Sequence, residues 1–348
     1  MKKAKDMKKT SKKALRRKVQ KVLGSILLVL ILITALLGGI WSITNLREVK
    51  HLDMSWPYEY VEPSADLSTD ADVQIAPSFA SDICVVRDDK GMEGIALIGS
   101  NERAALFDVD GKDSMYAVKA HERAYPASIT KIMTAILAIK YGDMNELVTI
   151  SQNAVTLEEG SQRCGFIAGD MVTMDELFHG LLVYSGNDAA NAIAENIGGS
   201  VENFVKMMNE ELRSIGATNS HFTNPHGLHS EEHYTTAYDI YLMLNEALKY
   251  PYFVDVMQLG MYSLTFTRGE EKISKTFEAT DRYLTGEVFA PTGVKVLGGK
   301  TGTTSQAGAC LAILSQNEYG KPYVSVVLTA PTKAVLYQDM NQLLEKIN

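Results

Sequence analysis

The feature that most constrains this chain is an uncharged apolar run near its N-terminus. Residues 22–43 read VLGSILLVLILITALLGGIWSI and contain no charged side chain. About 20 apolar residues span the hydrocarbon core of a bilayer, whereas a secretory signal usually has a shorter apolar stretch that ends in small residues of the A-x-A type. We therefore expect residues 22–43 to form an uncleaved transmembrane anchor, with a long cleavable signal peptide as the alternative.

The charges on either side of this run are distributed very unevenly. Residues 1–21 contain eleven Lys or Arg and one acid, Asp6, whereas the rest of the chain contains 23 basic and 41 acidic residues. Basic residues that precede a span stay in the cytoplasm. We therefore expect a single-pass protein of the cell membrane, with residues 1–21 in the cytoplasm and the body outside the cell. Because the body is acidic, we expect no nucleic-acid partner.

Residues 44–80 have the composition of a linker. Their stretch EYVEPSADLSTDADVQIAPS is acidic, contains two prolines and shows no sustained periodicity. Such a segment buries too little apolar surface to order itself. We expect residues 44–80 to be an extracytoplasmic linker and residues 81–348 to form the folded domain.

Three cysteines, Cys84, Cys164 and Cys310, are too few for a disulfide framework. At most one pair can close, and nothing in their spacing demands a bridge. We expect them to behave as small buried apolar side chains.

The hydrophobic pattern of the body is strand-like at both ends and helical in the middle. Strand-like runs cover residues 83–86, 104–109, 114–119, 263–267, 308–315 and 323–329. Helical patterns cover residues 130–139, 174–182, 189–197, 204–215, 235–250 and 333–347. We predict an α+β fold of the α/β/α sandwich type: one antiparallel sheet built from both chain ends and covered by helices, with an inserted all-helical lobe.

The first motif with chemical meaning is Ser128-Ile129-Thr130-Lys131, at the start of a predicted helix. Side chains three positions apart share a helical face, so the Ser128 hydroxyl and the Lys131 amine can lie within hydrogen-bond distance. A serine hydroxyl is a good nucleophile only when a base removes its proton, and a lysine can be that base only when burial or a second cation lowers its pKa. An S-x-x-K string is also common by chance, so alone it assigns no function.

The second cluster is Ser185-Gly186-Asn187, at a predicted junction between a loop and a helix. Ser and Asn at such a junction are more often helix caps than catalytic groups. The cluster acquires catalytic meaning only in combination with other motifs.

The third cluster lies in residues 298–304, which read GGKTGTT. Gly302 allows another backbone to come close, Lys300 brings a charge, and the hydroxyls of Thr301 and Thr303 suit a carboxylate. A flexible turn is one alternative. A phosphate-binding loop is another, but its pattern requires a glycine where Val294 stands.

Together the three clusters form a known signature. The strings S-x-x-K, S-D-N and K-T-G mark class A β-lactamases and penicillin-binding proteins, and here S-x-x-K, S-G-N and K-T-G occur in that order. The stretches YPASITKIMTAILAI, LFHGLLVYSGNDAANAIAE, ATNSHFTNPHGL and TTAYDIYLM also resemble the low-molecular-mass penicillin-binding D-alanyl-D-alanine carboxypeptidases. The resemblance covers about residues 81–335.

The resemblance implies catalytic roles for five side chains. Ser128 would be the acylated nucleophile and Lys131 its general base. Ser185 would relay a proton to the leaving D-alanine, steadied by Lys300. Asn187 would position Lys131 and the amide of the substrate.

It also implies a binding strand. Thr301, Gly302 and Thr303 would bind the substrate, with the two threonine hydroxyls on its terminal carboxylate. The backbone N–H groups of Ser128 and Thr303 would form an oxyanion hole, a preorganised pair of donors that stabilises developing charge.

The implied partners are peptidoglycan stem peptides that end in D-Ala-D-Ala, and β-lactams as covalent inhibitors, with no cofactor and no metal. Many close members of the family have His after K-T-G, where this chain has Thr303. Because K-T-G-T also occurs in transpeptidases and β-lactamases, a DD-endopeptidase, a transpeptidase or a serine β-lactamase is the alternative. The chain also ends after the helix predicted at 333–347, so we expect the N-terminal span to replace the C-terminal anchor of many relatives.

Two rival classes lie outside this chemistry. A zinc peptidase is suggested by His221, His226, His229 and His233, which fall within thirteen residues, but the chain contains no H-E-x-x-H. A binding or sensory ectodomain that kept the fold is the non-catalytic possibility. The complete set of motif residues argues against it.

Overall fold

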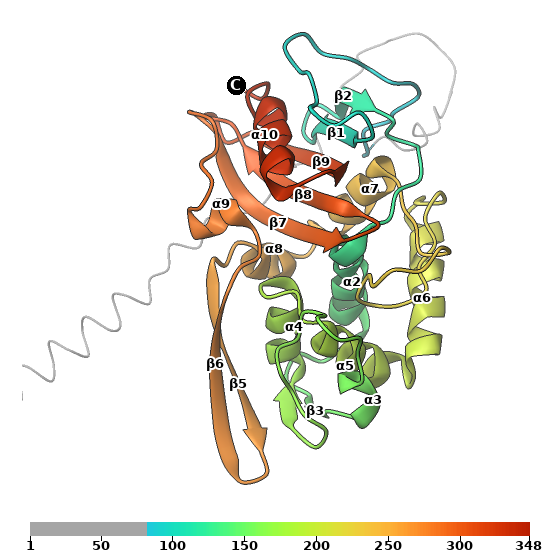
Figure 1. Cartoon of the computed structure of the whole chain (residues 1–348), viewed down its shortest axis with the longest axis vertical. Helices are drawn as coiled ribbons and strands as arrows, with labels where there is room; N and C mark the ends of the chain where they lie inside the picture. The colour runs from blue at the N-terminus through green and yellow to red at the C-terminus, as the bar shows by residue number, and fades with distance from the viewer. Residues whose placement is uncertain (1–81) are drawn as a thin grey trace, which may run out of the picture. The chain divides into compact units, whose positions relative to one another are not determined.

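The computed structural model describes residues 82–348, and the expected cytoplasmic segment (1–21), anchor (22–43) and linker (44–80) lie outside the described residues. Within 82–348, no helix is both long and apolar enough to cross a membrane. Two antiparallel sheets combine with helices, as in an α+β protein, which confirms the predicted class (Figure 1).

The main sheet has five strands in the order β2-β1-β9-β8-β7, and every neighbouring pair is antiparallel. Its strands are β1 (Arg103–Asp108), β2 (Asp113–Val118), β7 (Lys295–Thr304), β8 (Gly308–Gln316) and β9 (Pro322–Ala330). The central strands β8 and β9 are buried along nearly their whole length, since both faces of the sheet are covered. The sheet thus joins the two ends of the described chain, as predicted.

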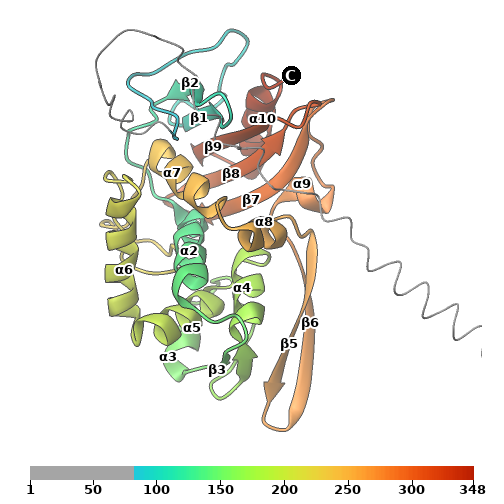
Figure 2. The same ribbon diagram turned by 180° about the vertical axis from the view of Figure 1, so that it is seen from behind.

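Helices cover the two faces of this sheet (Figures 1 and 2). On one face, α10 (Lys333–Leu344) buries Leu336, Met340 and Leu343 against β8 and β9. On the other face lies α7 (Ala237–Ala247), with α2 (Lys131–Tyr141) packed behind it and α8 (Pro251–Met257) against β7. Two separate apolar clusters result, one on each side of the sheet.

The inserted lobe contains α3 (Gln152–Val155), α4 (Met174–Leu182), α5 (Asn187–Gly198) and α6 (Val201–Ser214). Helices α4, α5 and α6 pack around α2, and α3 packs against α5. Local sequence explains where several helices begin. The side chains of Thr173, Ser200 and Thr236 each accept a hydrogen bond from a backbone N–H in the first turn of the helix that follows.

The prediction of an all-helical lobe was wrong in one respect. A second, four-stranded antiparallel sheet has the order β3-β4-β5-β6, from β3 (Leu147–Thr149), β4 (Met171–Thr173), β5 (Met261–Arg268) and β6 (Glu271–Glu278). The first two strands have three residues each, too few to produce a periodic pattern, and β6 has no fully buried residue. Such strands are defined by their partners and have weak sequence signals.

Other differences are local. Residues 83–86 form no strand; instead the backbone of Cys84 is held by hydrogen bonds with the hydroxyls of Tyr241 and Tyr238. The helix expected over 235–250 ends at Ala247, and Pro251 opens α8. All three cysteines are free and buried, as expected.

Candidate active site

Ser128 lies in a short 3-10 turn, η1 (Ala127–Thr130), that runs directly into α2. The amine Nζ of Lys131 donates a hydrogen bond to Ser128 Oγ at 3.0 Å, as the three-residue spacing predicts. Ala127 has a φ of 46°, a strained conformation for a residue with a side chain. The turn is held from outside by Gly227, where a Cβ would lie only 1.8 Å from the Ala127 carbonyl oxygen.

Lys131 is enclosed completely, with 0% of its surface exposed. Its Nζ also donates to Asn187 Oδ1 at 2.6 Å and to the backbone oxygen of His226 at 2.9 Å. Burial, together with the positive charge of Lys300, lowers the pKa of the Lys131 amine well below its usual value. The lowered pKa favours the uncharged form of the amine, the form that can accept the proton of the Ser128 hydroxyl.

Ser185 precedes the first residue of α5 by two positions and has a φ of 66°, the second strained residue of the site. Its Oγ accepts a hydrogen bond of 2.9 Å from Lys300 Nζ. Lys300 is 1% exposed, and burial lowers its pKa to about 7, opposed by the nearby carboxylate of Asp281. The second and third motifs, 115 residues apart, thus meet through one hydrogen bond.

The third motif is a strand and not a flexible turn. Residues 300–304 form the end of β7, the edge strand of the main sheet, which pairs with β8. Gly302 lets this strand approach the serine turn, because a Cβ there would lie 2.7 Å from Pro126 O and 3.0 Å from Ser128 N. Thr301 donates to the Thr280 hydroxyl at 2.6 Å, and Thr303 is exposed beside the turn.

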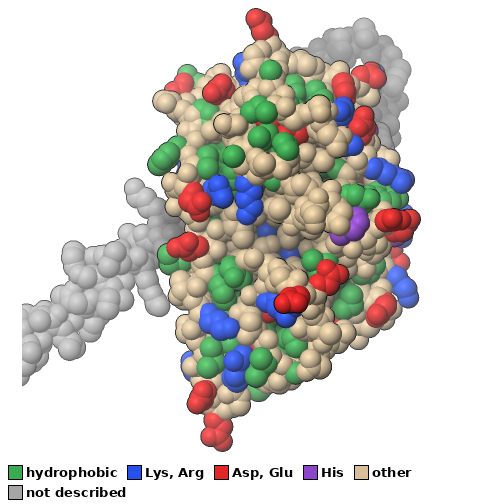
Figure 3. Space-filling model, in the orientation of Figure 1, with side chains coloured by type: hydrophobic (Ala, Val, Ile, Leu, Met, Phe, Trp, Pro, Cys, Tyr) green, Lys and Arg blue, Asp and Glu red, His purple; other side chains and the backbone are tan. Residues whose placement is uncertain are grey.

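The structure therefore brings together all eight residues singled out in the sequence, from η1, α2, the start of α5 and β7. Figure 3 shows basic side-chain atoms recessed in the middle of this face of the molecule, between the half that carries the main sheet and the helical half. Two buried lysines that face two serines are suited to proton transfer during acyl transfer.

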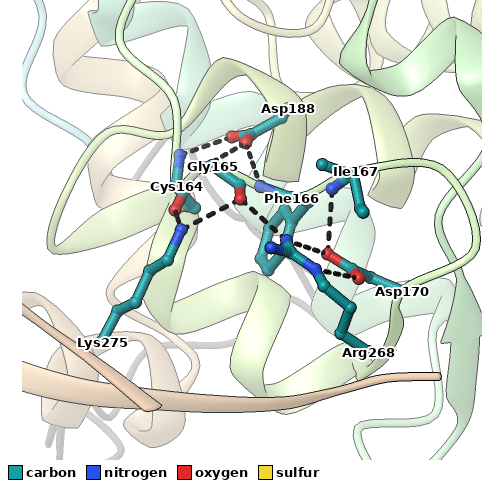
Figure 4. A network of polar contacts seen from close by, with 8 residues as sticks. All are labelled: Cys164, Gly165, Phe166, Ile167, Asp170, Asp188, Arg268 and Lys275. Atoms are coloured by element: carbon teal, nitrogen blue, oxygen red, sulfur yellow. Dashed lines mark hydrogen bonds and ion pairs between the residues drawn. The ribbon is translucent and has the colours of Figure 1, made fainter. Parts of the chain in front are cut away.

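The loop of residues 164–170, which contacts the start of α5, is held by a network of hydrogen bonds (Figure 4). The carboxylate of Asp188, next to Asn187 in α5, accepts hydrogen bonds from the backbone N–H groups of Cys164, Gly165 and Phe166. From β6, Lys275 Nζ donates to the carbonyl oxygens of Cys164 and Gly165, both at 3.0 Å.

An ion pair holds the C-terminal end of this loop. Arg268, at the end of β5, pairs with Asp170 through two hydrogen bonds of 2.8 Å, and Asp170 also accepts from Ile167 N. The buried thiol of Cys164 packs so closely that a Cβ at Gly186 would lie 2.4 Å from its sulfur. The small second sheet therefore supports the backbone of the second motif.

Comparison with known proteins agrees with this geometry. The model of the D-alanyl-D-alanine carboxypeptidase family (Peptidase S11) matches residues 99–332, about two thirds of the chain and all three motifs. The chain belongs to this family.

Two proteins similar to this chain are named as D-alanyl-D-alanine carboxypeptidases. The chain is 40% identical over 152 residues to the D-alanyl-D-alanine carboxypeptidase DacF of Bacillus subtilis, covering 42% of this chain and 39% of that protein. It is 31% identical over 237 residues to DacA of Haemophilus influenzae, covering 65% of this chain and 56% of that protein. It thus spans between two fifths and three fifths of the length of these two carboxypeptidases.

Among solved structures, a DD-transpeptidase of Streptomyces superposes with a TM-score of 0.65 at 25% identity, covering 72% of this chain and 96% of that one. The superposition supports the same fold around the site.

Sequence reasoning missed several residues that shape the site of this family member. His233 Nδ1 accepts from Thr223 N at 3.0 Å, so the neutral ring carries its proton on Nε2, which donates to Thr130 Oγ1 at 2.8 Å. Burial lowers the pKa of His233 to about 3, which keeps the ring neutral beneath the serine turn. His226 contributes only its backbone oxygen to Lys131.

Two histidines of the stretch 221–233 thus support the serine turn and Lys131 through hydrogen bonds. Among residues 82–348, no group of three His, Cys, Asp or Glu side chains is arranged to hold a metal ion. Asp281 is the other residue that was missed: it is 3% exposed, and burial raises its pKa to about 6.

Proposed function

We propose that this chain is a serine-type D-alanyl-D-alanine carboxypeptidase that removes the terminal D-alanine from peptidoglycan stem peptides through an acyl-enzyme on Ser128. β-Lactams would acylate the same hydroxyl. The observation that carries the proposal is the fully buried Lys131 amine, with a lowered pKa, 3.0 Å from Ser128 Oγ.

Acylation follows from this geometry. Lys131 Nζ accepts the proton of the Ser128 hydroxyl, and Oγ attacks the carbonyl carbon between the two D-alanines. The negative charge that develops on the carbonyl oxygen would be stabilised by the backbone N–H groups of Ser128 and Thr303. The close approach of Gly302 to Ser128 N supports this role. Asn187 keeps the amine aligned through its 2.6 Å hydrogen bond.

Release of the first product needs a proton on the leaving nitrogen. Ser185 gives its proton to that nitrogen as the C–N bond breaks, and Lys300, 2.9 Å away, supplies the replacement. Thr301 and Thr303 bind the carboxylate of the departing D-alanine. Water then attacks the ester carbonyl and gives one proton to Ser185, which passes its own proton back to the uncharged Lys300. Lys131 returns its proton to Ser128 Oγ as the ester bond breaks, and the shortened peptide leaves with a free carboxyl group.

Transpeptidation is the second candidate, because one of the similar structures is a DD-transpeptidase. The two reactions share the acyl-enzyme and differ in whether water or an amine resolves it. Incubation of residues 81–348 with a pentapeptide that ends in D-Ala-D-Ala, with and without added glycine as an amine acceptor, separates them. Mass spectrometry should show loss of one alanine with little glycine adduct; a dominant adduct would favour transpeptidation.

The nucleophile has its own test. Ser128→Ala should abolish both covalent labelling by a fluorescent penicillin and release of D-alanine, because within residues 82–348 the hydroxyl hydrogen-bonded to Lys131 Nζ is that of Ser128. A folded variant that still labels at the wild-type rate would refute the assignment.

We further propose that the chain is anchored by residues 22–43, with residues 1–21 in the cytoplasm and the catalytic domain outside. The charge step between residues 1–21 and the uncharged run supports this orientation. A flexible linker over residues 44–80 would average about 35 Å end to end, so the site would reach wall layers next to the membrane. External protease on intact protoplasts should release an active domain; a protected body, or a mature N-terminus just after Ile43, would contradict the anchor.

A further inference from the structure

A pocket of about 260 Å³ lies at the end of the main sheet toward which β7 runs. Its lining includes Arg103 at the start of β1, Thr329 near the end of β9, and Gln306 in the turn that follows β7. Strands β7 and β9 run the same way because each is antiparallel to β8, and β1 is antiparallel to β9. These three residues therefore meet at one end of the sheet.

The lining of this pocket includes residues that lie close in sequence to the nucleophile and to the binding strand. Tyr125 lies in its wall three residues before Ser128, and Gln306 lies three residues after Thr303. Three residues of extended chain span at most about 10 Å, so both connections are short.

The proposed chemistry gives the substrate a direction. The leaving D-alanine lies near Ser185 and Lys300, and the reacting carbonyl lies between the N–H groups of Ser128 and Thr303. The part of the peptide that stays on the enzyme must leave the site on the opposite side from the leaving group. That side is the C-terminal end of β7, where Gln306 and the pocket lie.

The lining of the pocket contains two arginines. The guanidinium of Arg123 stacks on the Tyr234 ring with 3.9 Å to its centroid, and it makes no ion pair within residues 82–348. Arg103 pairs with Glu122, but its Nε is buried without a hydrogen-bond partner. Thr329 has a buried hydroxyl that also lacks a partner, and its φ of 66° is strained. Because neither of these two buried atoms has surface open to the pocket, the charged donor that the pocket offers a ligand is the guanidinium of Arg123.

We propose that this pocket is a subsite for a free carboxylate of the stem peptide, carried by the residue two positions before the acylated D-alanine. The assignment rests on the proposed function, since that function sets the direction of the peptide. Two extended residues and a carboxylate-bearing side chain reach about 10 Å from the carbonyl carbon. This reach equals the greatest span of the three-residue connections from Ser128 to Tyr125 and from Thr303 to Gln306. A carboxylate accepts hydrogen bonds only, which suits the guanidinium donors of Arg123. One acid, Glu231, also lines the pocket and weakens its positive potential.

The test compares two peptides that differ only in this group. The first is L-Ala-γ-D-Glu-L-Lys-D-Ala-D-Ala, and the second has the free α-carboxylate of its γ-D-Glu converted to the amide. We expect the wild-type domain to show a kcat/KM roughly tenfold higher for the acidic peptide, the size of a charge-assisted hydrogen bond in a partly exposed site. If neither peptide loses D-alanine, the proposed function fails; if both lose it equally fast, the function stands and the subsite is refuted.

Three variants test which residue causes the preference for the acidic peptide. Arg123→Gln should reduce the acidic-to-amide ratio to about one, because an exposed guanidinium is removed without disturbing the core. Glu231→Gln should raise the ratio, since it removes the opposing charge. Arg213→Gln, which removes the same charge from an exposed position on α6, should leave the ratio unchanged. A ratio that survives Arg123→Gln, or that falls equally in Arg213→Gln, would overturn the proposal.

Discussion

Replacing Gly302 by alanine tests the geometry of the oxyanion hole with a single methyl group. That methyl would lie 2.7 Å from the Pro126 carbonyl oxygen, 3.0 Å from Ser128 N and 3.1 Å from Ala127 Cβ. The nearest atoms belong to backbone, so they cannot rotate away. Ordinary contacts begin near 3.4 Å, and β7 must therefore retreat from the serine turn by roughly 0.7 Å.

We expect this displacement of β7 to lower the rate of acylation. A misplacement of about 1 Å, or the loss of one oxyanion donor, typically lowers a rate by about 10²-fold or more. We expect Gly302→Ala to reduce the acylation rate constant for a fluorescent penicillin by about 10²-fold. The domain should still fold, because the φ of Gly302 lies outside the left-handed region and β7 is an edge strand.

The assay is the pseudo-first-order rate of covalent labelling, with a thermal melt to confirm folding. Gly91→Ala is the matched control, because a Cβ there meets no atom within 4 Å and its φ is also outside the left-handed region. Acylation of folded Gly302→Ala within about threefold of the control would refute the argument that this contact sets the donor spacing.

Three further predictions follow from the same site. Lys131→Ala should slow acylation by about 10² to 10⁴-fold while the domain stays folded, the usual contribution of a positioned general base; labelling within a few-fold of wild type would contradict that role. Thr303→Ala should weaken substrates with a terminal carboxylate more than uncharged ester analogues, because the hydroxyl is lost and the backbone N–H stays; equal losses of kcat/KM on both would argue against it. Asp281→Asn removes the carboxylate that raises the pKa of Lys300, so that pKa should fall below about 7. Because Lys300 acts in its charged form in our mechanism, the alkaline limb of the pH–rate profile should move to lower pH, and an unmoved limb would exclude this coupling.

Much of the site was determined by the sequence alone. The three-residue spacing of Ser128 and Lys131 brings their polar atoms together on any helix that starts there, whatever surrounds it. The side-chain caps at Thr173 and Thr236 also work through local hydrogen bonds, so two helix starts were predictable. The same holds for the buried runs of β8 and β9, which are apolar enough to indicate strands without knowledge of their partners.

Other features were decided only by tertiary structure. Strand β7 contains three glycines and no strong strand pattern, so its pairing with β8 and not its own propensity makes it a strand. The short strands β3 and β4 exist for the same reason.

The chemistry of the two lysines is the clearest example. A buried ammonium loses its hydration, and that loss, not the identity of the neighbours in the sequence, lowers the pKa of Lys131 and Lys300. The Lys131 amine is buried by parts of the chain that are far away in sequence. One of them contains His226, 95 residues from Lys131, whose backbone oxygen accepts a hydrogen bond from the amine. The sequence specified which groups meet, and only the packing around them lowered the pKa of the two amines.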